Sequence, residues 1–179
     1  MSDRYVAFLR GINVGGHAIV SMADLRKSFA AMGFDDVATY IQSGNVVFSS
    51  GGGPPEAADI EAHLARDFGG VTSAVVLRSA AELDVLVDAN PYLTPDADPK
   101  ALYVSFLGAP PAAEKAKAFG VPAGASERMT LVGQDVYQYF PEGYGRTKLS
   151  GAWLEKGLGV RATTRNWRTV TTLRRMAGE

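Results

Sequence analysis

A proline-rich segment, NPYLTPDADPK (residues 90–100), divides the sequence and most constrains how the chain folds. It holds three prolines in eleven residues, which is the composition of a linker. The same order of predicted elements occurs on each side of it, namely strand, helix, a two-stranded hairpin, helix, strand and helix. This order, β-α-β-β-α-β-α twice, predicts an α+β fold of two ferredoxin-like split β-α-β subdomains in tandem.

The predicted boundaries follow from this order. Residues 1–90 form the first subdomain, residues 91–100 the linker and residues 101–179 the second subdomain. Ser21 with Asp24 predicts a helix start, and Ser43-Gly44 predicts a two-residue hairpin turn. The predicted strands are 4–10, 37–42, 45–50, 72–79, 101–108, 127–132, 135–140 and 160–164, and the predicted helices are 21–33, 56–68, 79–89, 110–120, 147–157 and 165–176.

Composition excludes several kinds of chemistry. The chain of 179 residues has no cysteine, which excludes disulfides, thiolate catalysis and cysteine-based metal sites. Its two histidines, His17 and His63, lie far apart and in no metal-binding spacing, so no metal site is expected. The N-terminus has no signal-peptide pattern and no stretch is long and apolar enough to span a membrane, so we expect a cytoplasmic protein. Catalytic residues and a cofactor stay unassigned.

A long glycine-rich loop follows the first predicted strand, at residues 10–20. Its GINVGG sequence has the spacing of a phosphate loop, but the lysine and the serine or threonine that bind phosphate and magnesium do not follow. The glycines Gly11, Gly15 and Gly16 suit positive φ angles in a long connection. Arg10 and Asn13 lie beside these glycines in the sequence, and we expect their side chains to donate hydrogen bonds.

The positive charge gathers at the C-terminal end. Residues 142–179 contain 8 Lys and Arg against 3 Asp and Glu, whereas residues 1–141 contain 10 against 16. Arg146 and Lys148 are predicted at the start of one helix, and Arg165 and Arg168 at the start of another. The positive end of a helix dipole disfavours cations, so an anion is expected nearby. That anion is either a ligand or a carboxylate of the same protein.

Three tyrosines alternate on the predicted strands of the second half, namely Tyr103, Tyr137 and Tyr139. Such tyrosines can form an open aromatic sheet face of the kind that RNA-binding modules use. The favoured interpretation is that they cover a sheet face, because the RNA-recognition motif itself is absent and aromatic residues are common in strands.

Several motifs together carry a family resemblance. The segments LRGINVGG, MADLR, TYIQSGNVVF, TKLS and ATTRNWRTV, spread over residues 5–176, resemble domain-of-unknown-function family 1697 (DUF1697) of bacterial proteins. The resemblance implies a two-part α+β fold with ferredoxin-like halves, and it brings no established activity, cofactor or catalytic residue. In this family a lysine often follows GINVGG. His17 stands there in this chain, which removes a fixed positive charge from the loop.

The leading hypothesis is that the protein binds a small anionic or phosphorylated ligand between its two halves. The alternatives are a nucleic-acid-binding module and a non-catalytic protein-interaction module, and whether the protein is an enzyme and its oligomeric state stay open. The residues expected to bind the ligand are Arg10, Asn13, Gly15, Gly16, Gln42, Ser43, Asn45, Arg146, Lys148, Arg165 and Asn166.

Overall fold

A computed structural model describes residues 3–13, 19–71 and 73–179 of the chain. The chain divides into two compact units. The first comprises Met1–Asp84 together with Leu173–Glu179, and the second comprises Val85–Thr172. The described residues form two four-stranded antiparallel sheets and six α-helices, which confirms the predicted α+β class.

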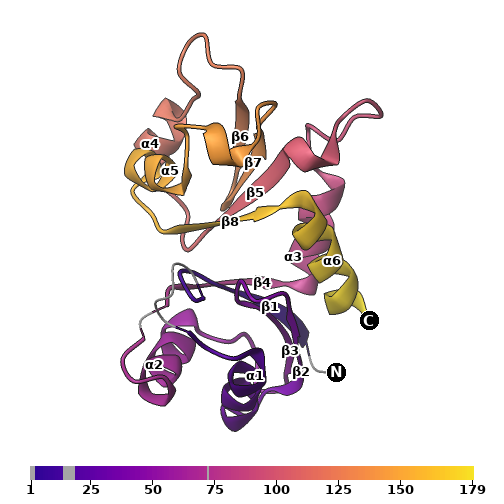
Figure 1. The fold of residues 1–179 in the computed structure, drawn as a ribbon, viewed down its shortest axis with the longest axis vertical. Coiled ribbons are helices and arrows are strands. Elements are labelled where there is room, and N and C mark those ends of the chain that lie inside the picture. Colours follow the sequence, from indigo (N-terminus) through magenta and orange to yellow (C-terminus); the bar gives the residue numbers. More distant parts are fainter. Residues whose placement is uncertain (1–2, 14–18, 72) are drawn as a thin grey trace. The chain divides into compact units, whose positions relative to one another are not determined.

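The first unit is built on a sheet with the strand order β2-β3-β1-β4. Helices α1 and α2 both lie against one face of this sheet (Figure 1). The elements are β1 (Asp3–Leu9), α1 (Met22–Ala31), β2 (Asp35–Tyr40), β3 (Asn45–Ser50), α2 (Ala57–Asp67), β4 (Val75–Ser79) and α3 (Ala80–Asp88), of which α3 continues into the second unit.

The core of the first unit follows from strand alternation. Tyr5, Ala7 and Leu9 of β1 point to the helix-covered face, because successive side chains of a strand alternate between its two faces. Phe29 of α1 meets Phe48 of β3 edge to face, with ring centroids 5.3 Å apart. This apolar layer fixes both helices on the sheet.

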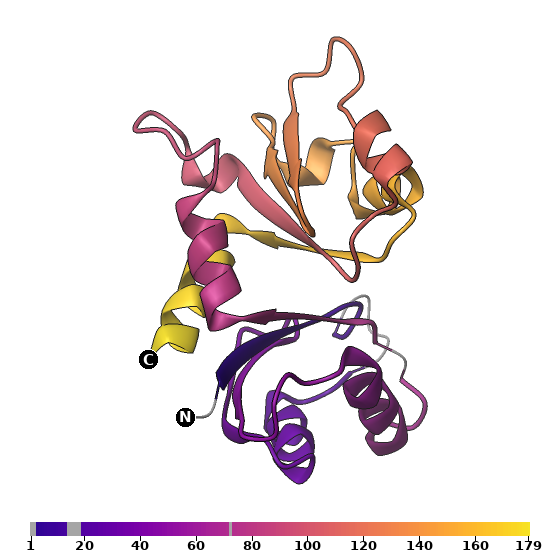
Figure 2. The same cartoon turned by 180° about the vertical axis from the view of Figure 1, so that it is seen from behind.

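The second unit repeats this arrangement with the strand order β6-β7-β5-β8. Figure 2 shows the same ribbon from behind. Leu107 and Val136 of the sheet are buried against Leu154 and Leu158 of α5. The elements are β5 (Leu102–Leu107), α4 (Ala113–Ala118), β6 (Arg128–Val132), β7 (Asp135–Tyr139), α5 (Gly151–Leu158), β8 (Ala162–Asn166) and α6 (Trp167–Gly178), with short 3-10 turns at Pro99–Ala101 (η1) and Tyr144–Arg146 (η2). The end of α6, from Leu173, belongs to the first unit.

The predicted element order is confirmed throughout, but the first hairpin turn differs from the prediction. Tyr40 pairs with Asn45, so the turn has the four residues 41–44 instead of Ser43-Gly44 alone. The Asn45 side-chain amide donates to the Tyr40 carbonyl at 3.1 Å and closes this wider turn. Ile41 and Gly44 take φ angles of 50° and 79°, and these left-handed conformations reverse the chain.

Candidate functional site

The described part of the long loop is braced by Asn13. Its Nδ2 donates to the carbonyls of Val20 at 2.9 Å and Gln42 at 3.0 Å, and its Oδ1 accepts from the Val20 amide at 2.8 Å. Both amide hydrogens are therefore used within the chain. Arg10 is exposed, and its backbone carbonyl accepts from the Ser73 hydroxyl at 2.8 Å.

The structure describes only part of this loop. Gly15, Gly16 and His17 lie outside the described residues.

The hairpin residues predicted to bind a ligand lie on the β2–β3 turn. Gln42 and Ser43 are exposed, whereas Asn45 is fully buried. The Asn45 amide donates to the Ser43 hydroxyl at 2.9 Å in addition to the Tyr40 carbonyl. Asn45 therefore stabilises the turn, and of these three predicted residues only Gln42 and Ser43 have side chains that face solvent.

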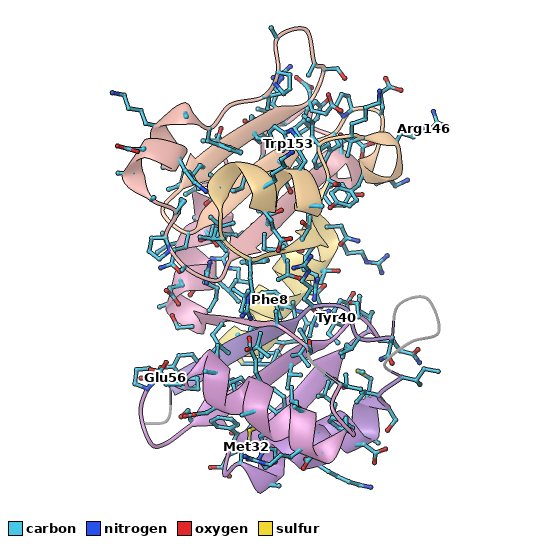
Figure 3. The ribbon with its side chains drawn as sticks, turned by 90° about the vertical axis from the view of Figure 1, so that its left-hand side faces the viewer. Phe8, Met32, Tyr40, Glu56, Arg146 and Trp153 are labelled. Carbon is cyan, nitrogen blue, oxygen red and sulfur yellow. The ribbon has the colours of Figure 1, made fainter. Side chains whose placement is uncertain are left out.

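Arg146 and Lys148 do not lie at the start of a helix, so that prediction is wrong. Helix α5 begins at Gly151 after Ser150, so both cations precede it. Both side chains are exposed, and in Figure 3 the Arg146 side chain points away from the ribbon. The sequence TKLS resembles a helix start because it offers Thr and Ser as caps. The Thr147 hydroxyl instead accepts from the Leu149 amide at 3.0 Å, forming a turn before the helix.

Arg165 lies on strand β8, so its predicted position at a helix start is also wrong. Its Nη1 donates to the Thr163 hydroxyl at 2.8 Å and to the Thr164 carbonyl at 3.0 Å. Burial lowers the pKa of Arg165 to about 10, so the guanidinium stays charged at neutral pH. Asn166 caps helix α6, since its Oδ1 accepts from the Thr169 amide at 2.8 Å.

The tyrosines of the second sheet do not share one face. Tyr137 pairs with Val104 and Tyr103 pairs with Gln138, so Tyr137 and Tyr139 point to one face and Tyr103 to the other. Tyr137 is buried and its hydroxyl donates to the Leu86 carbonyl at 2.9 Å. The ring of Tyr139 lies 6.4 Å from that of Tyr92. An open face of three tyrosines is therefore absent from the described sheet.

A different aromatic pair lies beside the two exposed cations. The rings of Tyr103 and Tyr144 stack with centroids 5.1 Å apart and 26° between their planes. Both rings are partly exposed, and the buried Phe140 supports them edge to face at 5.5 Å and 5.3 Å. Tyr144 begins the η2 turn that ends at Arg146. We name Tyr103, Tyr144, Arg146, Lys148 and Asn166 the tyrosine surface.

Strand pairing and hydrogen bonds hold the tyrosine surface together. Asn166 of β8 lies directly opposite Tyr103 of β5 in the sheet register. The Tyr144 hydroxyl accepts from the Gly151 amide at 3.1 Å, which ties the η2 turn to the start of α5. Sequence reasoning missed Tyr144 because it belongs to no predicted strand, and only the fold brings it onto Tyr103.

The segment that carries the two cations is anchored from a second side. The Thr147 hydroxyl donates to Glu127 Oε1 at 2.8 Å, and this hydrogen bond holds the pKa of Glu127 below its ordinary value. Thr147 lies between Arg146 and Lys148, so the anchor fixes the backbone that carries both cations. The side chains of Arg146 and Lys148 therefore extend from an anchored backbone.

A buried polar chain lies on the same face of the sheet. The Ser105 hydroxyl donates to Gln138 Oε1 at 2.8 Å and lies 2.7 Å from the Thr164 hydroxyl oxygen. Ser105 and Gln138 are fully buried, and these three side chains satisfy one another. The chain fixes the strands β5, β7 and β8 beneath the tyrosine surface.

The described residues offer neither a metal-binding cluster nor a membrane-spanning helix. They contain no group of three or more His, Asp or Glu side chains arranged to hold a metal ion. Among the described helices, none has both the length and the apolar character needed to cross a bilayer.

Comparisons with known proteins place the chain in context. A family model described as "Protein of unknown function (DUF1697)" matches residues 2–137. The solved structure of the conserved bacterial protein SP0830 from Streptococcus pneumoniae is similar, with 23% identity, a TM-score of 0.77 and 99% of each chain covered. No curated protein matches the sequence. The structural likeness supports the fold alone.

Proposed function

The chain belongs to DUF1697, a family of unknown function, and from that premise we propose that its second unit binds a small phosphorylated ligand with a planar group on the tyrosine surface. The observation that carries the proposal is the stacked, partly exposed pair of Tyr103 and Tyr144 beside two exposed cations on an anchored segment. Of the residues expected from the sequence, the proposal keeps Arg146, Lys148 and Asn166.

The arrangement suits two parts of one ligand. A partly exposed aromatic ring offers its face to a planar group, and stacking of a base on an aromatic side chain is worth about 1–3 kcal/mol. Arg146 and Lys148 offer cationic donors that suit a phosphate group. The Asn166 Oδ1 serves the α6 cap, so its amide NH₂ is the part of the side chain that faces a ligand.

Calorimetric titration of the protein with four compounds tests this proposal. AMP carries both groups, adenosine only the planar one, ribose 5-phosphate and inorganic phosphate only the anionic one. We expect AMP to bind more tightly than each of the other three. The double variant Arg146→Gln/Lys148→Gln removes the cations and should weaken AMP binding about tenfold while adenosine binding changes little.

A matched control separates local contacts from net charge. Lys117 on α4 and Lys156 on α5 are exposed cations of the same unit, and Lys117→Gln/Lys156→Gln changes the net charge equally. The control should leave AMP binding unchanged. Equal weakening by both double variants, or no heat with any of the four compounds, would contradict the proposal.

The nucleic-acid alternative gives a different result in the same experiment. A single-stranded RNA can use the same rings and cations, but its binding weakens steeply as salt is raised, because several phosphates release counterions together. If only oligonucleotides bind, and with that salt dependence, the ligand is a nucleic acid and not a small molecule.

We also propose that each unit is a ferredoxin-like split β-α-β unit. The support is the strand order, in which the first strand of each unit lies between the third and fourth strands and every pairing is antiparallel. A crystal structure of the full chain, with each unit superposed separately on ferredoxin-like domains, tests this assignment.

A further inference from the structure

A hollow lies in the first unit between helix α2 and the glycine-rich segment that precedes it. Its volume is about 470 Å³, within the range of small-molecule sites. Met32, Phe34 and Ile60 supply apolar side chains to its lining, and Gly52 and Pro54 belong to its rim. Figure 3 shows Glu56 where α2 begins and Met32 beside that helix. We call this cavity the α2 hollow.

One face of α2 gives the hollow charges of opposite sign at its two ends. Glu56 and Asp59 line it near the start of the helix, and His63 and Arg66 line it near the end. These positions follow one another at spacings of three or four residues, so they share a face. Two carboxylates exceed the roughly half positive charge of the helix N-terminus, so that end of the hollow is negative.

Glu56, Asp59 and Arg66 lack partners of opposite sign in the described chain, whereas His63 Nε2 lies 3.3 Å from Asp67 Oδ2. Among residues 3–13, 19–71 and 73–179, Glu56 and Asp59 form no ion pair, and Arg66 pairs with no carboxylate. Arg66 Nη2 instead donates to His63 Nδ1 at 3.4 Å. The guanidinium is thereby held at the wall of the hollow, where its other donors face a ligand.

The apolar wall is fixed by the core of the unit. The ring of Phe34 lies 4.4 Å from that of Phe48, and Ile60 is fully buried. Gly52 and Gly53 have open space where a Cβ would stand, and because they lack side chains they do not narrow the entrance to the hollow. The hollow therefore combines an apolar wall with a negative end and a positive end.

We propose that the α2 hollow binds a short peptide with free termini and apolar side chains. Its ammonium group faces Glu56 and Asp59, and its carboxylate faces Arg66. Asp59 and Arg66 are seven residues apart, or about 10.5 Å along the helix axis. An extended tripeptide spans about 10–11 Å, which matches this separation. Its side chains bury the exposed parts of Met32 and Phe34.

NMR titration of the ¹⁵N-labelled full chain with the tripeptide Leu-Phe-Leu tests the proposal. We expect saturable shifts of the amides of Gly52, Asp59 and Arg66. Acetylating the peptide N-terminus or amidating its C-terminus should each weaken binding about threefold, the size typical of an exposed charge contact.

Variants assign each peptide terminus to its end of the hollow. Arg66→Gln should weaken the free peptide about threefold and make amidation of its C-terminus without further effect. Glu56→Gln/Asp59→Asn should likewise weaken the free peptide about threefold and make acetylation of its N-terminus without further effect. Lys117→Gln on α4 is the matched control for charge and should change nothing.

Three results would overturn the proposal. One is the absence of shifts around the hollow at ~10 mM peptide, far above a Kd of about 1 mM. Another is equal affinity for the free and blocked peptides, since the charged ends would then play no part. The third is equal weakening by Lys117→Gln and Arg66→Gln.

Discussion

The side-chain amide of Asn13 donates to the backbone carbonyl of Gln42 at 3.0 Å and joins the long loop after β1 to the β2–β3 turn. Two more hydrogen bonds tie Asn13 to Val20, and its φ of 56° is one that asparagine tolerates well. Replacing Asn13 by alanine should lower the free energy of unfolding by about 2–3 kcal/mol. For a chain of this length the melting temperature should fall by about 4–12 °C.

The exposed side chain of Gln42 provides the control for Asn13→Ala. Only the backbone carbonyl of Gln42 takes part in the hydrogen bond with Asn13, so Gln42→Ala should change the unfolding free energy by less than about 0.5 kcal/mol. Equal losses from the two variants in urea titrations would show that Asn13 does not brace the loop.

The Asn13 contacts show which features of the loop the sequence predicts and which it does not. The loop length and the presence of a donor at position 13 are local features, and the sequence predicted both. The partner is the carbonyl of a residue 29 positions away, and no local pattern specifies it. A donor beside glycines was therefore interpreted as a ligand contact, although its hydrogens bind the chain itself.

Gly44 occupies a position that no other residue fits. Its φ is +79°, and a Cβ there would lie 2.8 Å from the Ile12 side chain and 2.9 Å from that of Leu9. Gly44→Ala should destabilise the fold by about 2–4 kcal/mol, because backbone strain adds to overpacking. Urea denaturation measures the loss. Gly51, which has open space around it, is the control, and Gly51→Ala should cost little.

The helix starts show a second limit of the sequence. Ser79 and Glu82 form a reciprocal capping box at the start of α3, where the sequence predicts a helix from residue 79, with hydrogen bonds of 2.7 Å and 3.2 Å to backbone amides. The starts of α5 and α6 lie later than predicted. Strand β8 extends to Asn166 because it pairs with β5 along its whole length, and this pairing is not visible in local propensity. Arg165 is therefore a strand residue.

Tyr144 replaces the missing side-chain cap of α5. Ser150 makes no side-chain capping bond, and the Gly151 amide donates to the Tyr144 hydroxyl instead. Tyr144→Phe should lower the free energy of unfolding by about 1 kcal/mol, because one helix amide loses its partner. Urea denaturation followed by tryptophan fluorescence, to which Trp153 of α5 and Trp167 of α6 both contribute, measures the change.

The same variant separates structure from binding at the tyrosine surface. Phenylalanine keeps a ring that can stack on Tyr103, so AMP binding to Tyr144→Phe should change less than twofold under the proposed function. The Tyr103 hydroxyl makes no hydrogen bond with any described residue. A large loss of stability with Tyr103→Phe would therefore show that the α5 cap is not the cause.

Tyr137 gives the fold a dependence on alkaline pH. Burial raises the pKa of Tyr137 to about 12 from its ordinary value near 10. The folded state therefore favours the neutral phenol, whose hydroxyl donates to the Leu86 carbonyl. The stability is fully present below pH ~10 and is lost as the pH rises towards ~12, by at most about 2.7 kcal/mol.

Comparison with Tyr137→Phe isolates this loss from the ionisation of the other side chains. The variant lacks the Leu86 hydrogen bond and should be about 1 kcal/mol less stable at neutral pH. Above pH ~10 the wild-type free energy of unfolding should fall more steeply than that of the variant, so the two values converge and then cross before pH ~12. Urea titrations at a series of pH values measure both curves. Parallel curves up to pH ~12 would mean that Tyr137 ionises in the folded state as it does in the unfolded chain.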